Sequence, residues 1–191
     1  MMPIAKRHGP HAIAAIGRVL RPMRADPARS PLVGQGFTAP QTITVSSPEF
    51  ADGAPMPLAC AGPGVGHNRS PELQWAGVPA ESRQLVLVLD DVDVPLPTPL
   101  IHSIAVLEPN VSGLAAGAFT ADQVRVIPTV LSKTGYSGPR PIPGHGPHRY
   151  RFHLLALDCP LPADINSAKH LIAAAAHHVL ARGILTGSYE R

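Results

Sequence analysis

The stretch from Gly135 to Asp158 reads GYSGPRPIPGHGPHRYRFHLLALD and decides the fold class more than any other part of the chain. Its first half cannot form a helix, because four prolines remove backbone donors and fix φ, while the glycines between them permit positive φ. The second half alternates as a strand does, with Tyr150, Phe152 and Leu154 on one face. The pattern therefore predicts a stiff loop that delivers His148 and Tyr150 to the start of a strand, and such loops commonly carry binding sites.

Short apolar runs rich in β-branched residues lie on both sides of this stretch. They predict further strands near residues 85–89, 101–107 and 124–127, and the globular part is expected to start with Ile43 and Val45. Residues 167–182 instead show helical spacing, with Ser167 as the N-cap and Gly183 just beyond the end. Many strands followed by one late helix indicate a mainly β protein, which we expect to be an antiparallel β-sandwich with a helix packed at one end.

The composition restricts the possible function classes. The chain has 191 residues, which is enough for one domain with a sizeable core. Its net charge is +3 and the basic residues are scattered, so nothing favours nucleic-acid binding. No apolar run approaches the roughly 18 residues of a membrane span. The two cysteines, Cys60 and Cys159, form no C-x-x-C motif, and we expect unpaired thiols in a reducing, cytoplasmic setting.

Residues 1–40 stand apart as an N-terminal appendage. Ile13, Ile16 and Leu20 share one face of a short amphipathic helix, which a proline ends. A signal peptide is disfavoured because Arg18 interrupts an already short apolar stretch. Three alternatives remain open: the helix docks on the domain or on a second subunit, it contacts a membrane surface, or the segment is disordered.

An acidic cluster, Asp90-Asp91-Val92-Asp93, directly follows the apolar strand expected at 85–89. In an extended chain Asp91 and Asp93 point to one face and Asp90 to the other. Two carboxylates at a strand end could ligate a metal, act as acid and base, or orient hydrogen-bond donors. They could also simply be solvated, and the spacing by itself favours that alternative.

The histidines fall into two groups. His102 opens one expected strand, and His148 lies two residues before Tyr150, so that the latter two side chains face the same side. Asp91, His102 and His148 are acceptable zinc ligands, although no pair among them has the short spacing of a metal motif. The remaining histidines are expected to be exposed or structural: His145 at an exposed loop tip, His153 on the opposite strand face, and His177 and His178 in the helix.

Familiar catalytic and nucleotide-binding motifs fail in this sequence. The run from Gly135 to Gly138 lacks the glycine spacing of a hydrolase nucleophile elbow, and no helix follows it. The glycines from Gly62 to Gly66 follow no clear strand and open no helix, so they do not predict dinucleotide binding, and there is no Walker loop. We therefore expect a binding protein without a cofactor rather than an enzyme.

Several motifs in register resemble the phosphatidylethanolamine-binding protein family, which includes the Raf kinase inhibitor proteins, and most closely its bacterial branch. An early Ser-Pro-x-Leu-x-Trp-x-Gly-Val-Pro motif is similar to residues 70–79, and an Asp-Pro-Asp-x-Pro segment is similar to residues 91–95. A strand that opens with histidine and closes on proline resembles residues 102–109. The loop and strand that end in His-Arg-Tyr resemble residues 135–150, and residues 185–189 resemble the bacterial ending.

The resemblance covers residues 41–191 and implies a Greek-key β-sandwich with a small anion-binding pocket at one end. It implies binding of phosphate or phosphorylated head groups such as phosphoethanolamine, a homodimer, and in some members inhibition of a kinase or protease. Carried over by position, the ligand-binding residues would be Asp91, His102, Gly138, His148 and Tyr150, supported by Asp93 and Arg149. A metal-assisted hydrolase that uses Asp91, His102 and His148 is the alternative.

The sequence departs from the family at three positions near this pocket. Val92 stands where the family has proline, and Ser103 stands where an aromatic residue is common and should widen or wet the pocket wall. Arg140 could add an anion contact or merely be exposed. For the pocket itself we expect Asp91 to accept a hydrogen bond from an imidazole whose other nitrogen donates to the anion. The Tyr150 hydroxyl and the Gly138 N–H would supply further donors.

Overall fold

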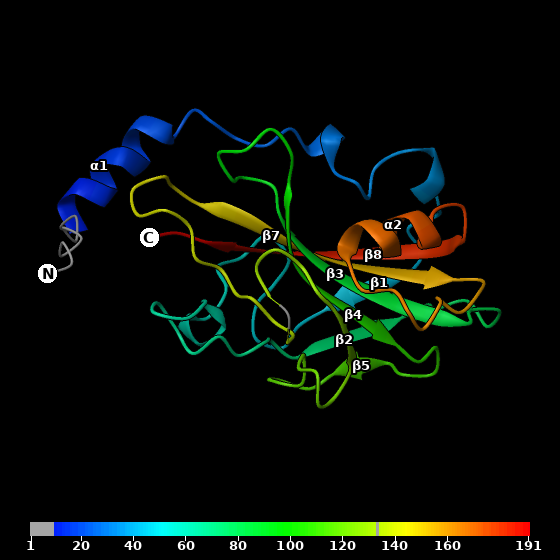
Figure 1. Cartoon of the computed structure of the whole chain (residues 1–191). Coiled ribbons are helices and arrows are strands. Elements are labelled where there is room, and N and C mark those ends of the chain that lie inside the picture. Colours follow the sequence, from blue (N-terminus) through cyan, green and yellow to red (C-terminus); the bar gives the residue numbers. More distant parts are fainter. Residues whose placement is uncertain (1–9, 133) are drawn as a thin grey trace, which may run out of the picture.

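Two antiparallel sheets form the body of the protein in the computed structural model, which describes residues 10–132 and 134–191 (Figure 1). The larger sheet has the order β6-β4-β3-β7-β8. Its strands are β3 (Gln84–Asp91), β4 (Leu100–Leu107), β6 (Arg125–Ile127), β7 (His148–Leu157) and β8 (Val179–Tyr189). The smaller sheet has the order β1-β2-β5, with β1 (Thr44–Ser46), β2 (Leu73–Ala76) and β5 (Gly113–Leu114).

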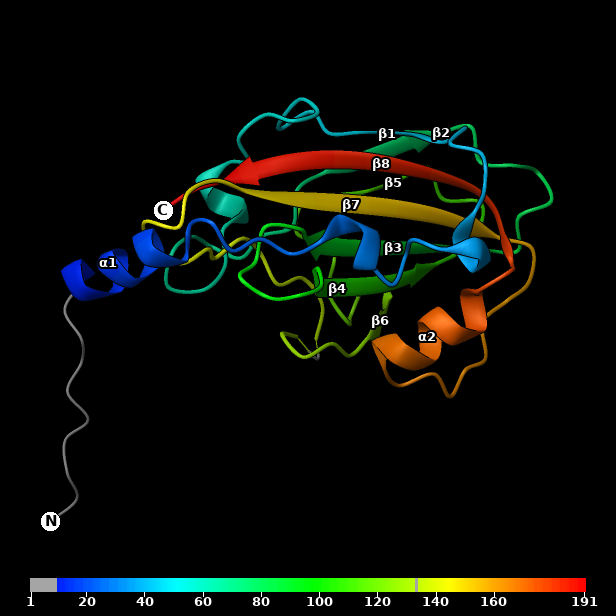
Figure 2. The ribbon, with the colours of Figure 1, turned by 90° about the horizontal axis from the view of Figure 1, so that it is seen from above.

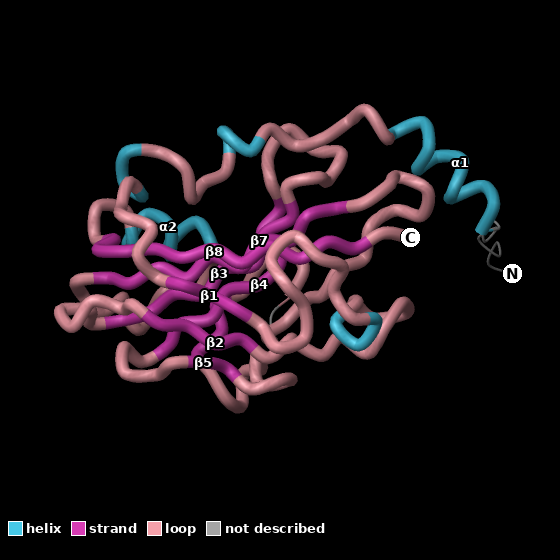
Figure 3. The backbone as a smooth tube through the Cα atoms, turned by 180° about the vertical axis from the view of Figure 1, so that it is seen from behind, coloured by secondary structure: helices cyan, strands magenta, loops and turns pink. Residues whose placement is uncertain are grey.

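Helices occupy the periphery of the sheets, as Figure 3 shows from behind. The two α-helices are α1 (Pro10–Leu20) and α2 (Ala168–Ala175), and short 3₁₀ turns occur at Pro27–Arg29, Gln35–Phe37 and Leu58–Cys60. Neither α-helix of the described chain has the length and apolar content that a bilayer crossing requires.

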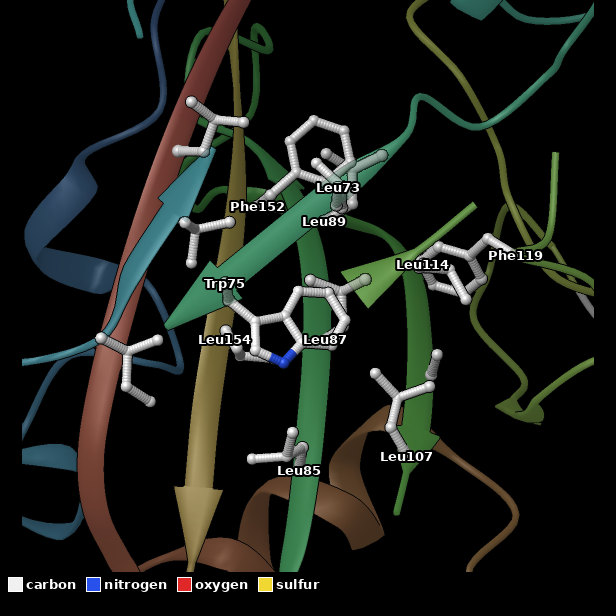
Figure 4. Close-up of a cluster of buried hydrophobic side chains, with 14 of the residues drawn as sticks. Leu73, Trp75, Leu85, Leu87, Leu89, Leu107, Leu114, Phe119, Phe152 and Leu154 are labelled. Atoms are coloured by element: carbon white, nitrogen blue, oxygen red, sulfur yellow. The ribbon is translucent and has the colours of Figure 1, made fainter. Parts of the chain in front are cut away.

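Strand β3 is apolar on both faces because both faces of the larger sheet are covered. Leu85, Leu87 and Leu89 point into the core between the two sheets, together with residues of β7 and with Trp75 of β2 (Figure 4). On the opposite face Val86 and Val88 belong to a second core, which includes α2 and the segment that leads to β1. The uninterrupted apolar run of β3 thus reflects burial on two sides.

The predicted mainly β class, with antiparallel sheets and two helices, is confirmed. The Greek-key path of the chain and the division at residue 40 stay predictions. The strands expected at 85–89, 101–107 and 124–127 correspond to β3, β4 and β6, and Val45, expected near the start of the globular part, lies in β1. The cysteines are free, with Cys60 buried and Cys159 partly buried.

The predicted helix over residues 167–182 is wrong in its second half. Ser167 caps α2 as expected, since its hydroxyl oxygen accepts from the His170 N–H at 3.3 Å. The helix ends at Ala175, His177 adopts a positive φ of 69°, and β8 then pairs with β7 along its length. His177 and His178 therefore lie in a turn and not in a helix. The pairing of β8 with β7, a strand of ten residues, outweighs the helix propensity of the alanine-rich segment before it.

Gly183 is a close-packing position inside β8 rather than a helix end. A Cβ atom there would lie 2.3 Å from the carbonyl oxygen of Ile43, in the segment that enters β1. Alternating residues of β8 face the core, which is the pattern of a strand that covers one side of the sheet.

The described part of the N-terminal appendage packs on the domain, while residues 1–9 lie outside the described residues. Helix α1 lies beyond the start of β7 (Figure 2), and it contacts the loop before β7 through two glycines. A Cβ atom at Gly17 would lie 2.0 Å from the Pro143 carbonyl oxygen, and one at Gly144 would lie 2.5 Å from that of Ala14. The expected apolar face is not the contact, since the Ile16 side chain is 54% exposed.

Candidate functional site

A cavity of about 580 Å³ lies where β3 ends and β7 begins. Asp91, His102, His148 and Tyr150 line it together with Gly138 from the loop before β7, so the two expected loop regions converge. The four polar side chains are buried. Much of the remaining wall is apolar and includes Val94, Leu96, Leu100, Leu131 and Ile142.

Strand register explains three of these positions. Asp91 pairs with Tyr150 across the β3–β7 ladder, and directly paired residues of antiparallel strands project to the same face. His148 precedes Tyr150 by two residues and therefore shares that face. Asp90 faces the other way and pairs with Arg151 and His153, as the alternation predicted for Asp90 and His153.

A β-bulge explains the fourth position. Leu89 pairs with Ser103 but Asp90 pairs with Ile101, so His102 is an extra residue in β4. Bulges re-aim side chains at the ends of sheets. Here the bulge brings the His102 ring into edge-on contact with Tyr150, at 5.4 Å between ring centroids, on the face that carries Asp91.

His148 is held at both ring nitrogens by other protein groups. Its Nδ1 lies 2.8 Å from Asp91 Oδ2, and its Nε2 lies 2.6 Å from His145 Nδ1. The Nε2 of His145 in turn donates to the carbonyl of Leu20 at 2.9 Å. The expectation that the second nitrogen of such an imidazole donates to the anion is therefore wrong for His148. The predicted exposure of His145 is also wrong, because α1 and the residues after it cover this ring.

His102 presents a free nitrogen lone pair to the cavity. Its Nδ1 lies 2.9 Å from the Ser137 carbonyl, which can only accept, so Nδ1 carries the proton. Burial lowers the pKa of His102, although Asp91 nearby acts to raise it. The ring is therefore neutral, and its unprotonated Nε2 lies 3.9 Å from Asp91 Oδ2.

The Tyr150 hydroxyl is buried and finds no hydrogen-bond partner among the described residues. Burial, and then the charge of Asp91, raise the pKa of Tyr150 well above its ordinary value. The hydroxyl thus keeps its proton and is a donor. Buried polar atoms without partners are rare in proteins and point to a ligand or to water.

Gly138 lines the cavity, but its N–H is already engaged. It donates to Asn68 Oδ1 at 2.9 Å, so the expectation that it donates to a guest is wrong for this structure. A Cβ atom at this position would lie 2.0 Å from the Cys60 carbonyl oxygen, which explains why the position is glycine.

Asp93 and Arg149 lie beside the cavity and are not among the residues that line it. Asp93 accepts from the backbone N–H and from the guanidinium of Arg149 at 2.8–3.0 Å. Burial alone would raise the pKa of Asp93, but these hydrogen bonds hold it below its usual range. The Asp93 N–H donates to Asp91 Oδ1 at 2.9 Å, so this turn fixes the Asp91 carboxylate.

The three departures from the family pattern have separate outcomes. Ser103 is buried, is not among the residues that line the cavity, and accepts from the Ser137 N–H at 2.8 Å, so the expected change of the cavity wall stays a prediction. Arg140 is exposed at the wall of the cavity. The Val92 N–H donates to the Arg149 carbonyl at 3.2 Å, a bond that proline could not make.

The geometry does not favour a metal site in the cavity. Because both nitrogens of His148 are engaged, only Asp91 and the Nε2 of His102 remain as ligands. Within the described ranges a group with metal-ligand spacing occurs elsewhere, at the far end of β7, where partly exposed side chains of Asp158, Cys159 and His178 meet.

Comparison with known proteins agrees with the motifs. The family model described as phosphatidylethanolamine-binding protein matches residues 46–190. A UPF0098 protein of Chlamydia muridarum is 34% identical over 159 residues, which cover 78% of this chain and 99% of the relative. LppC of Mycobacterium tuberculosis, which bears the name of a lipoprotein, is 35% identical over 80% of this chain and 74% of its own length. The expected cytoplasmic location stays a prediction.

Solved structures show the same fold. A phosphatidylethanolamine-binding protein homologue from Chlamydia trachomatis superposes with a TM-score of 0.69 at 32% identity, and it covers 79% of this chain and 99% of the homologue. YbcL of Escherichia coli, described as a member of the mammalian PEBP family, has a TM-score of 0.71 at 25% identity, with 78% and 99% covered.

Proposed function

This chain belongs to the phosphatidylethanolamine-binding protein family, and we propose that it binds a small phosphate-bearing guest in the cavity at the ends of β3 and β7. The observation that carries the proposal is the Tyr150 hydroxyl, a buried donor without a protein partner in the described structure that lines a cavity with Asp91 and His102. A phosphate oxygen would satisfy this donor.

A phosphate beside the Asp91 carboxylate requires compensation, because like charges repel. His148 neutralises part of that charge through its bond to Asp91. The monoanionic form of the guest carries a P–OH group, which donates to the lone pair of His102 Nε2, while another phosphate oxygen accepts from Tyr150. Each charge-assisted hydrogen bond contributes on the order of 1.5–3 kcal/mol. Part of this is offset by the entropy that the guest and the cavity side chains lose on binding, so we expect a dissociation constant between micromolar and millimolar.

The cavity has room for more than the phosphate group. Leu96, Leu131 and Ile142 line it and would contact the ester part of a head group, such as the carbon atoms of phosphoethanolamine. Arg140 would attract the anion on approach. A homodimer, contact with a membrane surface, and a kinase or protease target all stay predictions.

The same groups favour binding over turnover. His148 is not free to act as a base, because both of its nitrogens are engaged. Tyr150 retains its proton, since its pKa is raised by burial. We therefore propose a binding protein and expect no hydrolysis of the guest.

Tyr150→Phe should weaken binding of phosphoethanolamine about 10- to 100-fold, because it removes one charge-assisted bond of the guest. The melting temperature should not fall, since the hydroxyl has no partner among the described residues. Titration calorimetry and thermal unfolding measure the two effects.

Tyr136→Phe is the matched control, because Tyr136 lines the same cavity but its hydroxyl donates to the Cys60 carbonyl at 3.1 Å. That variant should lose about 1 kcal/mol of unfolding free energy and little affinity. Unchanged affinity in Tyr150→Phe would contradict the proposal.

The affinity should fall as pH rises above about 6, the second pKa of a phosphomonoester. The lowered pKa of His102 keeps its ring neutral in this range, so the ring accepts a proton that only the monoanionic guest offers. Above that pH the dianion meets a lone pair and a carboxylate instead. Calorimetry at a series of pH values tests this, with sulfate as a control anion that has no proton to donate. Binding that strengthens towards pH 8 would refute the proposed arrangement.

A further inference from the structure

A chain of three hydrogen bonds leaves the cavity and ends in the N-terminal segment. It runs from Asp91 Oδ2 to His148 Nδ1 at 2.8 Å, from His148 Nε2 to His145 Nδ1 at 2.6 Å, and from His145 Nε2 to the Leu20 carbonyl at 2.9 Å. Leu20 is the last residue of α1, which lies beside the loop that carries His145 (Figure 2). Asp91 and His148 line the cavity, whereas His145 does not.

Counting protons along this chain determines its charge. The Leu20 carbonyl can only accept, so His145 Nε2 must carry a proton, and a neutral His145 ring then presents Nδ1 as an acceptor. His148 Nε2 must therefore be protonated as well. The contact between His148 Nδ1 and Asp91 needs one more proton, either on the ring or on the carboxyl. In both forms the Asp91–His148 pair holds one proton more than a neutral imidazole beside a carboxylate, and its net charge is zero.

The groups around His145 disfavour a different distribution of these protons. Burial, then Arg24 and His148, lower the pKa of His145, so the ring that accepts is the neutral one. Arg24 Nη2 donates to the His145 carbonyl at 3.0 Å, and Arg21 Nε donates to the Gly144 carbonyl at 2.9 Å. The charged and titratable groups that face the chain from neighbouring elements are Arg21, Arg24, Asp93, His102, Arg149 and Tyr150.

We propose that His145 is a positioning residue of the anion site, which keeps an extra proton on the Asp91–His148 pair and so removes a negative charge from the cavity. Without an acceptor at position 145, His148 relaxes to a neutral ring protonated on Nδ1, and Asp91 remains a carboxylate with a net charge of −1. The effect on anion binding rests on the proposed function, but the proton count does not.

The same geometry makes the N-terminal segment part of the site. The Leu20 carbonyl fixes the tautomer of His145, and the close contact of Gly17 with the Pro143 carbonyl holds α1 against the loop. Among the α1 residues whose side chains the structure describes, none lines the cavity, so the helix acts on it through the two imidazoles.

The protonation states are tested in the ligand-free full-length protein by ¹⁵N NMR of the imidazole nitrogens at about pH 7.5, one unit above the ordinary histidine pKa. We expect a proton on His148 Nε2, in either a doubly protonated ring or the Nε2–H tautomer. A neutral His148 ring that is protonated only on Nδ1 would overturn the proposal. This measurement needs no variant and no ligand.

Two variants at position 145 test the consequence for binding of inorganic phosphate by calorimetry. His145→Phe fills the space but offers no acceptor to His148 Nε2, so the extra proton of the Asp91–His148 pair loses its partner and phosphate affinity should fall about tenfold or more at about pH 7.5. At about pH 5.5, where protons are about a hundredfold more abundant, the Asp91–His148 pair takes up its extra proton from solvent more readily, and the loss should shrink to about twofold. His145→Gln supplies one acceptor and one donor and should restore binding at the higher pH.

The outcomes separate this proposal from the proposed function. Equal losses at both pH values, or no rescue by glutamine, would show a merely structural role and overturn the role of His145. If the unmodified protein binds no phosphate at either pH, the proposed function fails, and the NMR result alone then decides the proton count.

Discussion

Asp90→Leu should lower the free energy of unfolding by about 3–5 kcal/mol, because it leaves buried positive charge without a partner. The Asp90 side chain is fully buried and accepts from Arg151 Nε at 2.9 Å and Nη2 at 2.6 Å. His153 Nε2 lies 3.3 Å from the same carboxylate. This cluster lies on the face of β3 opposite the cavity, so the substitution tests the sheet that carries the site rather than the site itself.

The double variant Asp90→Leu/Arg151→Met provides the matched control. If the loss of unfolding free energy in the single variant comes from the Arg151 guanidinium that has lost its partner, removing Arg151 as well should recover a large part of that loss. Urea unfolding of the unmodified protein, the two single variants and the double variant gives the four unfolding free energies of a double-mutant cycle. A double variant no more stable than Asp90→Leu would show that the ion pair is not the source of the effect.

The acid dependence of this contribution follows from the pKa of Asp90. Burial alone would raise that pKa, but the nearby His153 ring and the hydrogen bonds from Arg151 hold it below its usual value. A lowered pKa in the folded state means that the stabilisation is complete above the unfolded value of about 3.9 and is lost as pH falls through the folded one.

Gly138→Ala should abolish guest binding, with an affinity loss of well over about tenfold, and should destabilise the fold by about 1–3 kcal/mol through overpacking. The added Cβ atom would lie 2.0 Å from the Cys60 carbonyl oxygen and 2.9 Å from a ring carbon of Tyr136. Because both neighbours are held in place, the loop that carries residue 138 must move. The adjacent Ser137 carbonyl would then leave Nδ1 of His102, and the ring that faces the guest would lose its orientation.

Gly64→Ala is the control for this experiment. Gly64 has a φ of +80°, but a Cβ atom there would meet nothing within 4 Å. We expect only the backbone penalty of about 1–2 kcal/mol and unchanged affinity for phosphoethanolamine. Calorimetry and thermal unfolding of both variants separate a steric effect on the site from a general loss of stability. Binding that survives in Gly138→Ala would contradict the role given to this loop.

Much of the fold could be predicted from local patterns. The apolar run at residues 85–89 and the alternation after His148 correspond to β3 and β7. The same alternation predicted that His148 and Tyr150 share a face and that Asp90 points away from Asp91, and both are confirmed. These predictions succeed because side-chain direction within one strand depends only on the period of two.

Other features could not be predicted, because they depend on contacts between distant segments. Residues 176–182 have the composition of a helix, yet they begin β8 and its adjacent turn, since β7 offers a partner. His145 was expected to be exposed, and it is buried because a helix more than a hundred residues earlier covers it. His102 reaches the cavity through a bulge that only the pairing with β3 defines.

The order of residues along each segment therefore settles which chemical groups this protein possesses and on which side of a strand most of them lie. Protonation and hydrogen-bond roles at the cavity follow from neighbours that come together only on folding. Asp91, His148, His145 and the Leu20 carbonyl are spread over more than a hundred residues of chain, and the tautomer of each ring depends on the next group in contact. The physical reason is that a hydrogen bond needs both a donor and an acceptor. The sequence shows each group, but only folding brings its partner from a distant segment into contact.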